Sequence, residues 1–308
     1  ESGKFQDGVE YFTNYKHLFK KSLDIIFVSL PNYLAAEATI EGLEHGCHVF
    51  CEKPPAKTVG EVIKVIEYEK KHSDLKLKYG FNHRYHDSVG EAMKLIKSRK
   101  LGDLINLRGV YGKSKIVSFA SDWRTERSIA GGGILLDQGI HLLDMMRLFA
   151  GEFTEVYSFI SNDFWQHDVE DNAYALMRTE NNIIAMVHSS ATQWRHQFRL
   201  EITLTMGAIV LGGILSGSKS YGDETMTTIY KGVGEGDAPT EQTVSYSVDH
   251  SWKDEIDEFT NAIVDDKPIL YGTAQEALKT MELVYKIYCA DASWKERFQL
   301  SCEVPKNL

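Results

Sequence analysis

The chain is short of cysteine and proline and has no long apolar run. Its 308 residues include 4 cysteines and 6 prolines. The longest apolar stretch, near 207–215, is far shorter than the ~18 residues of a membrane helix. The first residues are polar, so no secretion signal is expected, and few cysteines suit a reducing compartment. These absences predict a cytoplasmic protein that does not enter a membrane.

Net positive charge and a metal-binding pattern are also missing. The formal charge is -10, and a field of that sign repels nucleic acid. The stretch "HGCHVFC" holds His45, Cys47, His48 and Cys51, but on a strand the two cysteines would face one side and His48 the other. No second ligand pair has zinc-like spacing. We expect no nucleic-acid partner, no metal, and buried structural cysteines.

Residues 1–80 carry an alternation of strands and helices. The composition, 43% hydrophobic and 25% charged, is that of a globular protein, and the length suggests two domains. The near-continuous apolar run Leu23–Leu30 is typical of a central parallel strand. Helical, strand, helical and strand patterns follow at 33–46, 48–51, 58–72 and 76–81. This order predicts a doubly wound α/β unit.

From about residue 81 the pattern changes to that of an α+β domain. Helices are expected at 88–100, 131–151, 251–266 and 273–293. Strands are expected at 104–112, 155–162, 172–179, 183–193, 198–205 and 208–213. The predicted fold class is therefore α/β: an incomplete doubly wound, Rossmann-like parallel-sheet domain over 1–80, then an α+β domain over 81–308 with a large open, mainly antiparallel sheet and terminal helices.

The stretch "FCEKPPAKT" places Lys53 at the end of an expected buried strand, before Pro54 and Pro55. Ligands of open parallel sheets bind at the carboxyl ends of the strands. Proline fixes its own φ and restricts the residue before it, so Lys53 is held extended. A partly desolvated lysine can have a lowered pKa and can donate a proton or hydrogen bond to a substrate hydroxyl. The alternative is an ordinary surface lysine in a tight loop.

A second candidate lies in "GGGILLDQGIHLLD", where Asp137 and His141 are four residues apart and Asp144 continues the stripe. On a helix such residues share a face. A carboxylate and an imidazole among apolar neighbours are costly unless they are paired or used. The carboxylate could orient the histidine for proton transfer near neutral pH. A structural Asp–His pair without chemistry is the alternative.

Together these stretches resemble a known family. In order and spacing, "SLPN", "HGCHVFCEKP", "GFNHRY" and "GGGILLDQGIHLLD" are similar to the sugar and cyclitol dehydrogenases named for glucose–fructose oxidoreductase, inositol dehydrogenase and a rhizopine-catabolism protein (Gfo/Idh/MocA). The resemblance implies a dinucleotide-binding domain followed by an open antiparallel sheet. It also implies hydride transfer between NAD or NADP and a sugar or polyol carbon.

The resemblance also implies roles for particular residues. Lys53 would contact the reacting hydroxyl, His141 would be the general acid/base, and Asp137 its acidic partner; all three would meet the substrate. The residues expected to bind the cofactor are Lys53 with Ser29, Leu30, Pro31, Asn32, Glu52, Arg84, Trp123 and Arg124. Of these, Arg84 would also border the substrate.

One part of the family pattern is missing. The G-x-G-x-x-G turn that holds a pyrophosphate after a first strand does not occur, and Gly131–Gly133 follows no strand in a βαβ context. Either the sequence is a fragment of a longer protein or cofactor binding has been lost, and we favour the fragment. The choice between NAD and NADP stays open.

Basic and aromatic residues in the second domain bear on the substrate. They comprise Lys113, Lys115, Arg124, Arg127, Tyr221 and the stretch "QWRHQFR" at 193–199. An arginine-bearing face beside the site would suit a nucleotide sugar or a sugar acid; a solvated sheet face or a subunit contact is the alternative. A polyol such as an inositol is the second substrate class, and a non-catalytic ligand sensor the second functional class. The broad sheet also suggests a homodimer or homotetramer.

Overall fold

The computed structural model describes residues 8–115, 123–216, 220–234 and 236–301. Its first part is a parallel sheet of three strands in the order β1-β2-β3. The strands and their connecting helices are β1 (Ile25–Val28), α1 (Asn32–Glu44), β2 (His48–Glu52), α2 (Val59–Glu69) and β3 (Leu77–Gly80). The predicted parallel α/β unit is confirmed. Among the residues described, no helix has the length and apolar character to cross a bilayer.

The central strand and the helix after it fix the loop that bears Lys53. In β2, Val49, Phe50 and Cys51 are buried, as expected of a strand covered on both faces. The helix α2 begins at a capping box in which the Thr58 side chain accepts from the Glu61 backbone N–H and the Glu61 side chain accepts from the Thr58 N–H. The loop 53–57 is therefore held between a buried strand and a capped helix.

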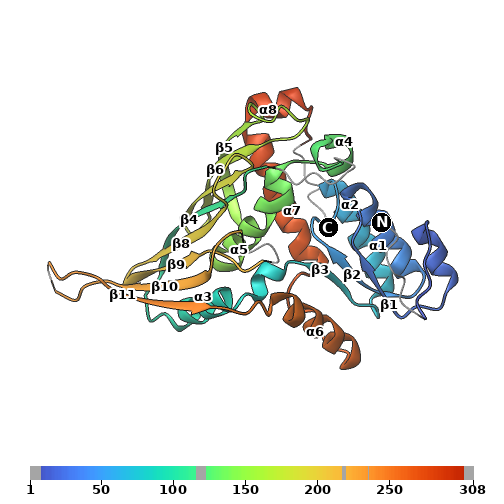
Figure 1. Ribbon diagram of the computed structural model, residues 1–308, viewed down its shortest axis with the longest axis horizontal. Helices are drawn as coiled ribbons and strands as arrows, with labels where there is room; N and C mark the ends of the chain where they lie inside the picture. Colours follow the sequence, from blue (N-terminus) through green and yellow to red (C-terminus); the bar gives the residue numbers. More distant parts are fainter. Residues whose placement is uncertain (1–7, 116–122, 217–219, 235, 302–308) are drawn as a thin grey trace.

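The second part is a sheet of eight strands in the order β11-β10-β9-β8-β4-β7-β6-β5 (Figure 1). Its strands are β4 (Leu104–Gly112), β5 (Phe153–Ser161), β6 (Asn172–Thr179), β7 (Ile184–Ser190), β8 (Gln197–Leu204), β9 (Gly207–Gly212), β10 (Glu224–Tyr230) and β11 (Thr240–Tyr246). All neighbours are antiparallel except β4 and β7. The mainly antiparallel sheet is confirmed. Two features were not predicted: β4 inserts between β7 and β8, and the polar, threonine-rich β10 and β11 extend the edge.

Helices cover one face of this sheet and join it to the first. The longer ones are α3 (Asp87–Ser98), α5 (Ile140–Ala150), α6 (Ser251–Val264) and α7 (Ala274–Ala290). The shorter helices and turns are η1 (Tyr15–Lys20), η2 (Lys70–His72), η3 (Asn82–Tyr85), η4 (Trp123–Thr125), α4 (Arg127–Ala130), η5 (Leu135–Gly139) and α8 (Ala292–Arg297). Helix α7 runs between the two sheets (Figure 1), and one continuous apolar core includes residues of both.

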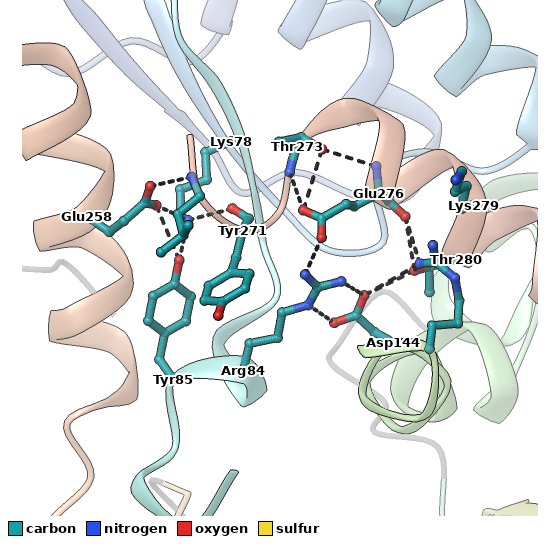
Figure 2. A network of polar contacts seen from close by, with 12 residues as sticks. Lys78, Arg84, Tyr85, Asp144, Glu258, Tyr271, Thr273, Glu276, Lys279 and Thr280 are labelled. Atoms are coloured by element: carbon teal, nitrogen blue, oxygen red, sulfur yellow. Dashed lines mark hydrogen bonds and ion pairs between the residues drawn. The ribbon is translucent and has the colours of Figure 1, made fainter. Parts of the chain in front are cut away.

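A buried lysine also ties the two parts together. The Lys78 side chain, in β3, is fully buried. Its Nζ donates to the Tyr85 hydroxyl (2.6 Å) and the Tyr271 carbonyl (2.7 Å) and forms an ion pair with Glu258 of α6 (Figure 2). A buried ammonium is tolerated only when its donors are used, so this contact fixes α6 against the first sheet.

Replacing Lys78 with Met should destabilise the protein by about 3 kcal/mol, because Glu258 would then be largely buried without its partner. The matched control is Lys94→Met, which removes an exposed ion pair with Glu91 and should cost at most about 0.5 kcal/mol. Urea unfolding of the two variants measures the difference. Equal unfolding midpoints would contradict a structural role for the Lys78 contact.

Candidate active site

A cavity of about 600 Å³ opens at the carboxyl ends of β1 and β2, facing the second sheet and α5. Lining residues that the sequence analysis named are Ser29, Leu30, Pro31, Asn32, Glu52, Lys53, Trp123, Arg124, Asp137 and His141. The other lining residues, none of which was predicted to belong to a site, are Pro54, Asn82, His83, Tyr111, Leu215, Ser216 and Trp252. The two main motifs, 84 residues apart in the chain, therefore meet at one cavity.

Lys53 contacts the helix that carries the second motif. Its Nζ donates a hydrogen bond to the Asp137 backbone carbonyl, 2.6 Å away. The peptide bond between Lys53 and Pro54 is cis. Burial lowers the pKa of Lys53, and the nearby Asp137 and Glu52 only partly offset that effect. The ammonium therefore gives up its proton more readily than an exposed lysine does.

The Asp137 carboxylate is surrounded by cations. Lys113 Nζ lies 2.8 Å from Oδ2, and Arg124 Nε lies 3.4 Å from Oδ1. Burial alone would raise the pKa of Asp137, but Lys113, Lys53 and Arg124 outweigh it and hold the pKa well below its usual range. Lys113 comes from the end of β4, so this cluster joins the large sheet to the loop after β2.

This arrangement corrects the expectation that Asp137 is the partner of His141. Between them the chain forms the π-helical turn η5, which has more residues per turn than an α-helix, so a spacing of four no longer aligns two side chains. The Asp137 carboxylate turns to Lys113 and Arg124 instead. Among the residues described, His141 Nδ1 is buried without a hydrogen-bond partner. Burial and the nearby Lys53 lower the pKa of His141 well below its ordinary value, so its imidazole is neutral.

Arg84 lies away from the cavity that it was expected to border. Its Nε and Nη2 donate to the two Asp144 oxygens (2.6 and 2.7 Å), and Nη1 donates to Glu276 at the start of α7 (Figure 2). The guanidinium is buried and fully occupied by these two carboxylates. Asp144, which the spacing grouped with Asp137 and His141, is thus part of a structural contact between η3, α5 and α7.

Tyr221 does not line the main cavity but lies behind Tyr111, which does. Its ring packs edge-on against Tyr111 at 5.2 Å between centroids, and its hydroxyl accepts from Gln138. With Arg195, Tyr221 lines a second, smaller cavity of about 320 Å³. Arg199 instead pairs with Glu201 at 2.6 Å and is exposed. Of the two arginines in the stretch 193–199, Arg195 is therefore the one that lines a cavity with Tyr221.

Sequence reasoning missed Glu170, which anchors the turn bearing Asp137. This buried carboxylate accepts from the backbone N–H groups of Gly133 (2.8 Å) and Leu135 (3.0 Å) and from the Tyr288 hydroxyl (2.6 Å). A Cβ on Gly133 would lie 2.1 Å from the Glu170 carbonyl oxygen, so glycine is required by this close approach. A lone glutamate in "VEDNA" gives no local signal for the contact.

The structure also bears on the predictions for the cysteines and for metal binding. Cys47 and Cys51 are buried free thiols, as expected. Cys289 is disulfide-bonded, so the cysteine count by itself is no guide to the redox compartment; Cys302 lies outside the described residues. In the described part of the chain, no group of three or more His, Cys, Asp or Glu side chains could hold a metal ion.

Both parts of the chain match families of known proteins. Residues 4–81 match the model of an oxidoreductase family with an NAD-binding Rossmann fold, and residues 89–210 match the GFO/IDH/MocA C-terminal domain. Levoglucosan dehydrogenase of Pseudarthrobacter phenanthrenivorans is 35% identical over 141 residues, 45% of this chain and 36% of that protein. D-glucoside 3-dehydrogenase of Escherichia coli is 25% identical over 293 residues, 86% and 76% of the two chains.

Solved structures share the fold. Levoglucosan dehydrogenase in complex with NADH and levoglucosan has a TM-score of 0.79 at 21% identity, covering 92% of this chain and 82% of that one. Aldose–aldose oxidoreductase from Caulobacter crescentus, complexed with glycerol, has a TM-score of 0.77 at 24% identity, covering 91% and 80%. The chain spans between 36% and 61% of the length of the first curated relatives that it matches.

The Asp137 cluster should give a specific pH dependence of stability. Because the pKa of Asp137 is depressed by folding, its stabilisation is complete above the unfolded value of about 3.9 and is lost as pH falls below it. Asp137→Asn should therefore be less stable than the wild type at neutral pH, and the gap should narrow below about pH 4.

Urea unfolding across this pH range measures that gap. The control is Asp103→Asn, whose side chain is 76% exposed and lies 3.9 Å from Arg99; it should change stability little at any pH. A gap for Asp137→Asn that stays constant with pH would refute the ionised cluster.

Proposed function

Because the chain belongs to the Gfo/Idh/MocA family of oxidoreductases, we propose that it transfers a hydride between NAD or NADP and a CH–OH carbon of a sugar. The observation that carries this proposal is the meeting of Lys53, Asp137 and His141 at one cavity. A site that only bound a ligand would not need a partly buried lysine of lowered pKa beside a neutral histidine.

The cavity suits the nicotinamide end of the cofactor. Ser29 to Asn32 follow β1 and Glu52 ends β2, at the edge of a parallel sheet where nucleotides bind. Partial burial raises the pKa of Glu52, and a carboxyl group of this kind could hydrogen-bond a ribose hydroxyl. The Trp123 ring, stacked with Arg124 at 4.2 Å, offers a flat wall. Nicotinamide, when bound, supplies the hydride acceptor or donor.

Proton transfer would fall to His141. In the direction of sugar oxidation, its neutral imidazole can accept the hydroxyl proton. The Lys53 ammonium donates a hydrogen bond to the same oxygen and stabilises the negative charge that develops there as the proton leaves; hydride transfer from the carbon to nicotinamide then turns the C–O bond into a neutral carbonyl. Asp137 acts indirectly: its carbonyl accepts from Lys53, and its carboxylate is held by Lys113 and Arg124.

Charges around the cavity bear on the substrate class. Arg124 lines the main cavity and Arg195 the smaller one behind Tyr221. Guanidinium groups suit a carboxylate or phosphate, which favours a sugar acid or nucleotide sugar. The relatives named for levoglucosan and D-glucosides favour an uncharged sugar ring at the reacting end. A polyol dehydrogenase and a ligand-sensing regulator of the same family are the alternatives, and catalytic turnover separates the regulator from both enzymes.

The catalytic roles can be tested by substitution. Lys53→Met and His141→Asn should each lower turnover at least about 100-fold, because each removes a group that acts on the reacting oxygen. Cofactor affinity should change less than about threefold, since neither role needs tight binding. The control is Lys64→Met on the exposed face of α2. Formation of reduced nicotinamide, followed by absorbance with a panel of sugars, gives turnover; unaltered turnover in Lys53→Met would refute the assignment.

We also infer that the chain forms a homodimer or homotetramer through the large sheet. Strands β5, β6 and β7 expose apolar residues on the face away from the helices: Tyr157, Phe159, Tyr174, Leu176, Ile184 and Met186. Phe159 is 81% exposed. A contiguous apolar patch of this kind is unusual on a monomer.

Phe159→Glu should weaken the assembly, because it places a charge in the apolar contact. Sedimentation velocity measures the result: the wild type should sediment as a dimer or tetramer and the variant as a smaller species. Val264→Glu, at an exposed site on α6, is the control. A wild-type monomer would contradict this inference.

A further inference from the structure

His141 lacks the hydrogen bond that usually fixes a catalytic histidine. Among the residues described, its Nδ1 has no partner, and the carboxylate of Asp137 faces Lys113 and Arg124. Its ring is stacked on His83, whose imidazole lies parallel to it at 3.8 Å between centroids and 12° between planes, while the Phe81 ring lies edge-on and farther away, at 6.3 Å. Both rings are buried, and both line the cavity.

The His83 ring is itself fixed by two hydrogen bonds. Nδ1 lies 3.0 Å from Asn82 Oδ1, and Nε2 lies 3.0 Å from the Tyr111 hydroxyl. Asn82 uses its Nδ2 to donate to Ser251 Oγ at 3.2 Å, so its Oδ1 is the acceptor. His83 therefore carries its proton on Nδ1 and accepts from Tyr111 at Nε2. Both nitrogens are occupied, which leaves the ring face as its free surface.

The same short turn holds the catalytic helix at a second point. Arg84, the next residue, binds Asp144, which lies three positions after His141 on α5. Figure 2 shows this guanidinium facing the Asp144 carboxylate. The turn η3 thus contacts α5 twice: Arg84 fixes the helix, and His83 contacts the imidazole.

We propose that His83 is the positioning residue of the site: stacked face to face on His141, it holds that ring in one orientation and keeps it neutral. The expected effect of His83 variants on turnover rests on the proposed dehydrogenase function. Their expected effect on the orientation and protonation of the His141 ring does not. His83 exchanges no proton with the substrate, because both its nitrogens are occupied.

The charges around the stack favour a neutral His141. Lys53 faces it from the loop after β2, and His86, paired with Glu224 at 2.7 Å, lies at the end of η3. Tyr111 of β4 and Asp137 of the preceding turn complete the polar surroundings. A proton on His141 would add a positive charge beside Lys53 and against a ring that is shielded from water. Removing the His83 ring would admit water and ease protonation.

The test is the titration of His141, followed by NMR of histidine-labelled protein and assigned with His141→Asn. In His83→Ala the pKa of His141 should rise toward the ordinary histidine value, because water replaces the ring. In His83→Phe, which keeps a flat ring, it should stay low. His83→Leu fills the space without a flat ring and replaces the alanine variant if that one does not fold. His17→Ala, at an exposed position, is the control.

Turnover gives a second readout. In His83→Ala or His83→Leu, kcat for sugar oxidation should fall about 100-fold, with the acidic limb of its pH profile moved upward; His83→Phe should lose far less. A His141 titration that is the same in all variants would overturn the proposal, as would equal losses in the phenylalanine and leucine variants. A wild-type protein without dehydrogenase activity would refute the proposed function and leave the titration result standing.

Discussion

The ion cluster around Asp137 is the interaction on which the site depends. One partly buried carboxylate contacts Lys113 from the end of the large sheet and Arg124 from η4, while the carbonyl of the same residue accepts from Lys53. Three cations gathered at a partly buried place would repel one another without that anion. The cluster therefore joins the parallel sheet, the antiparallel sheet and the helical segment that bears His141 at a single residue, and it sets where the Lys53 ammonium lies.

A second consequence follows for the histidine. Because Asp137 is occupied by cations, His141 must be positioned from elsewhere, and the short turn after β3 does so through His83 and Arg84. Glu170 holds the start of the same helical segment through the Gly133 and Leu135 N–H groups. The helical segment that bears His141 is thus fixed at its start and along its length by polar contacts that are nearly all buried. Rigid support of this kind is what a proton-transfer site requires.

Local sequence patterns predicted the helices and strands well, but they predicted poorly which side chains contact each other. The apolar run before Pro31, the helical pattern from residue 58 and the strand patterns of β6 and β8 depend on neighbours in the chain, so they can be predicted from it. The π-helical turn at Leu135–Gly139 cannot. This turn prevents the expected contact between Asp137 and His141, and it depends on hydrogen bonds to Glu170, a residue distant in the sequence. The prediction that Arg84 borders the cavity was wrong because the sequence around a single arginine does not show whether its side chain will face a ligand or two carboxylates of the protein.

The central claim is that Lys53 and His141 act on one reacting oxygen while Asp137 remains bound to its cations. A crystal structure of the protein with a reduced nicotinamide cofactor and a sugar tests this most directly. The account predicts one sugar hydroxyl within hydrogen-bond distance of both Lys53 Nζ and a ring nitrogen of His141, with the Asp137 carboxylate still on Lys113 and Arg124. A sugar seated away from Lys53, or an Asp137 carboxylate turned toward His141, would contradict it.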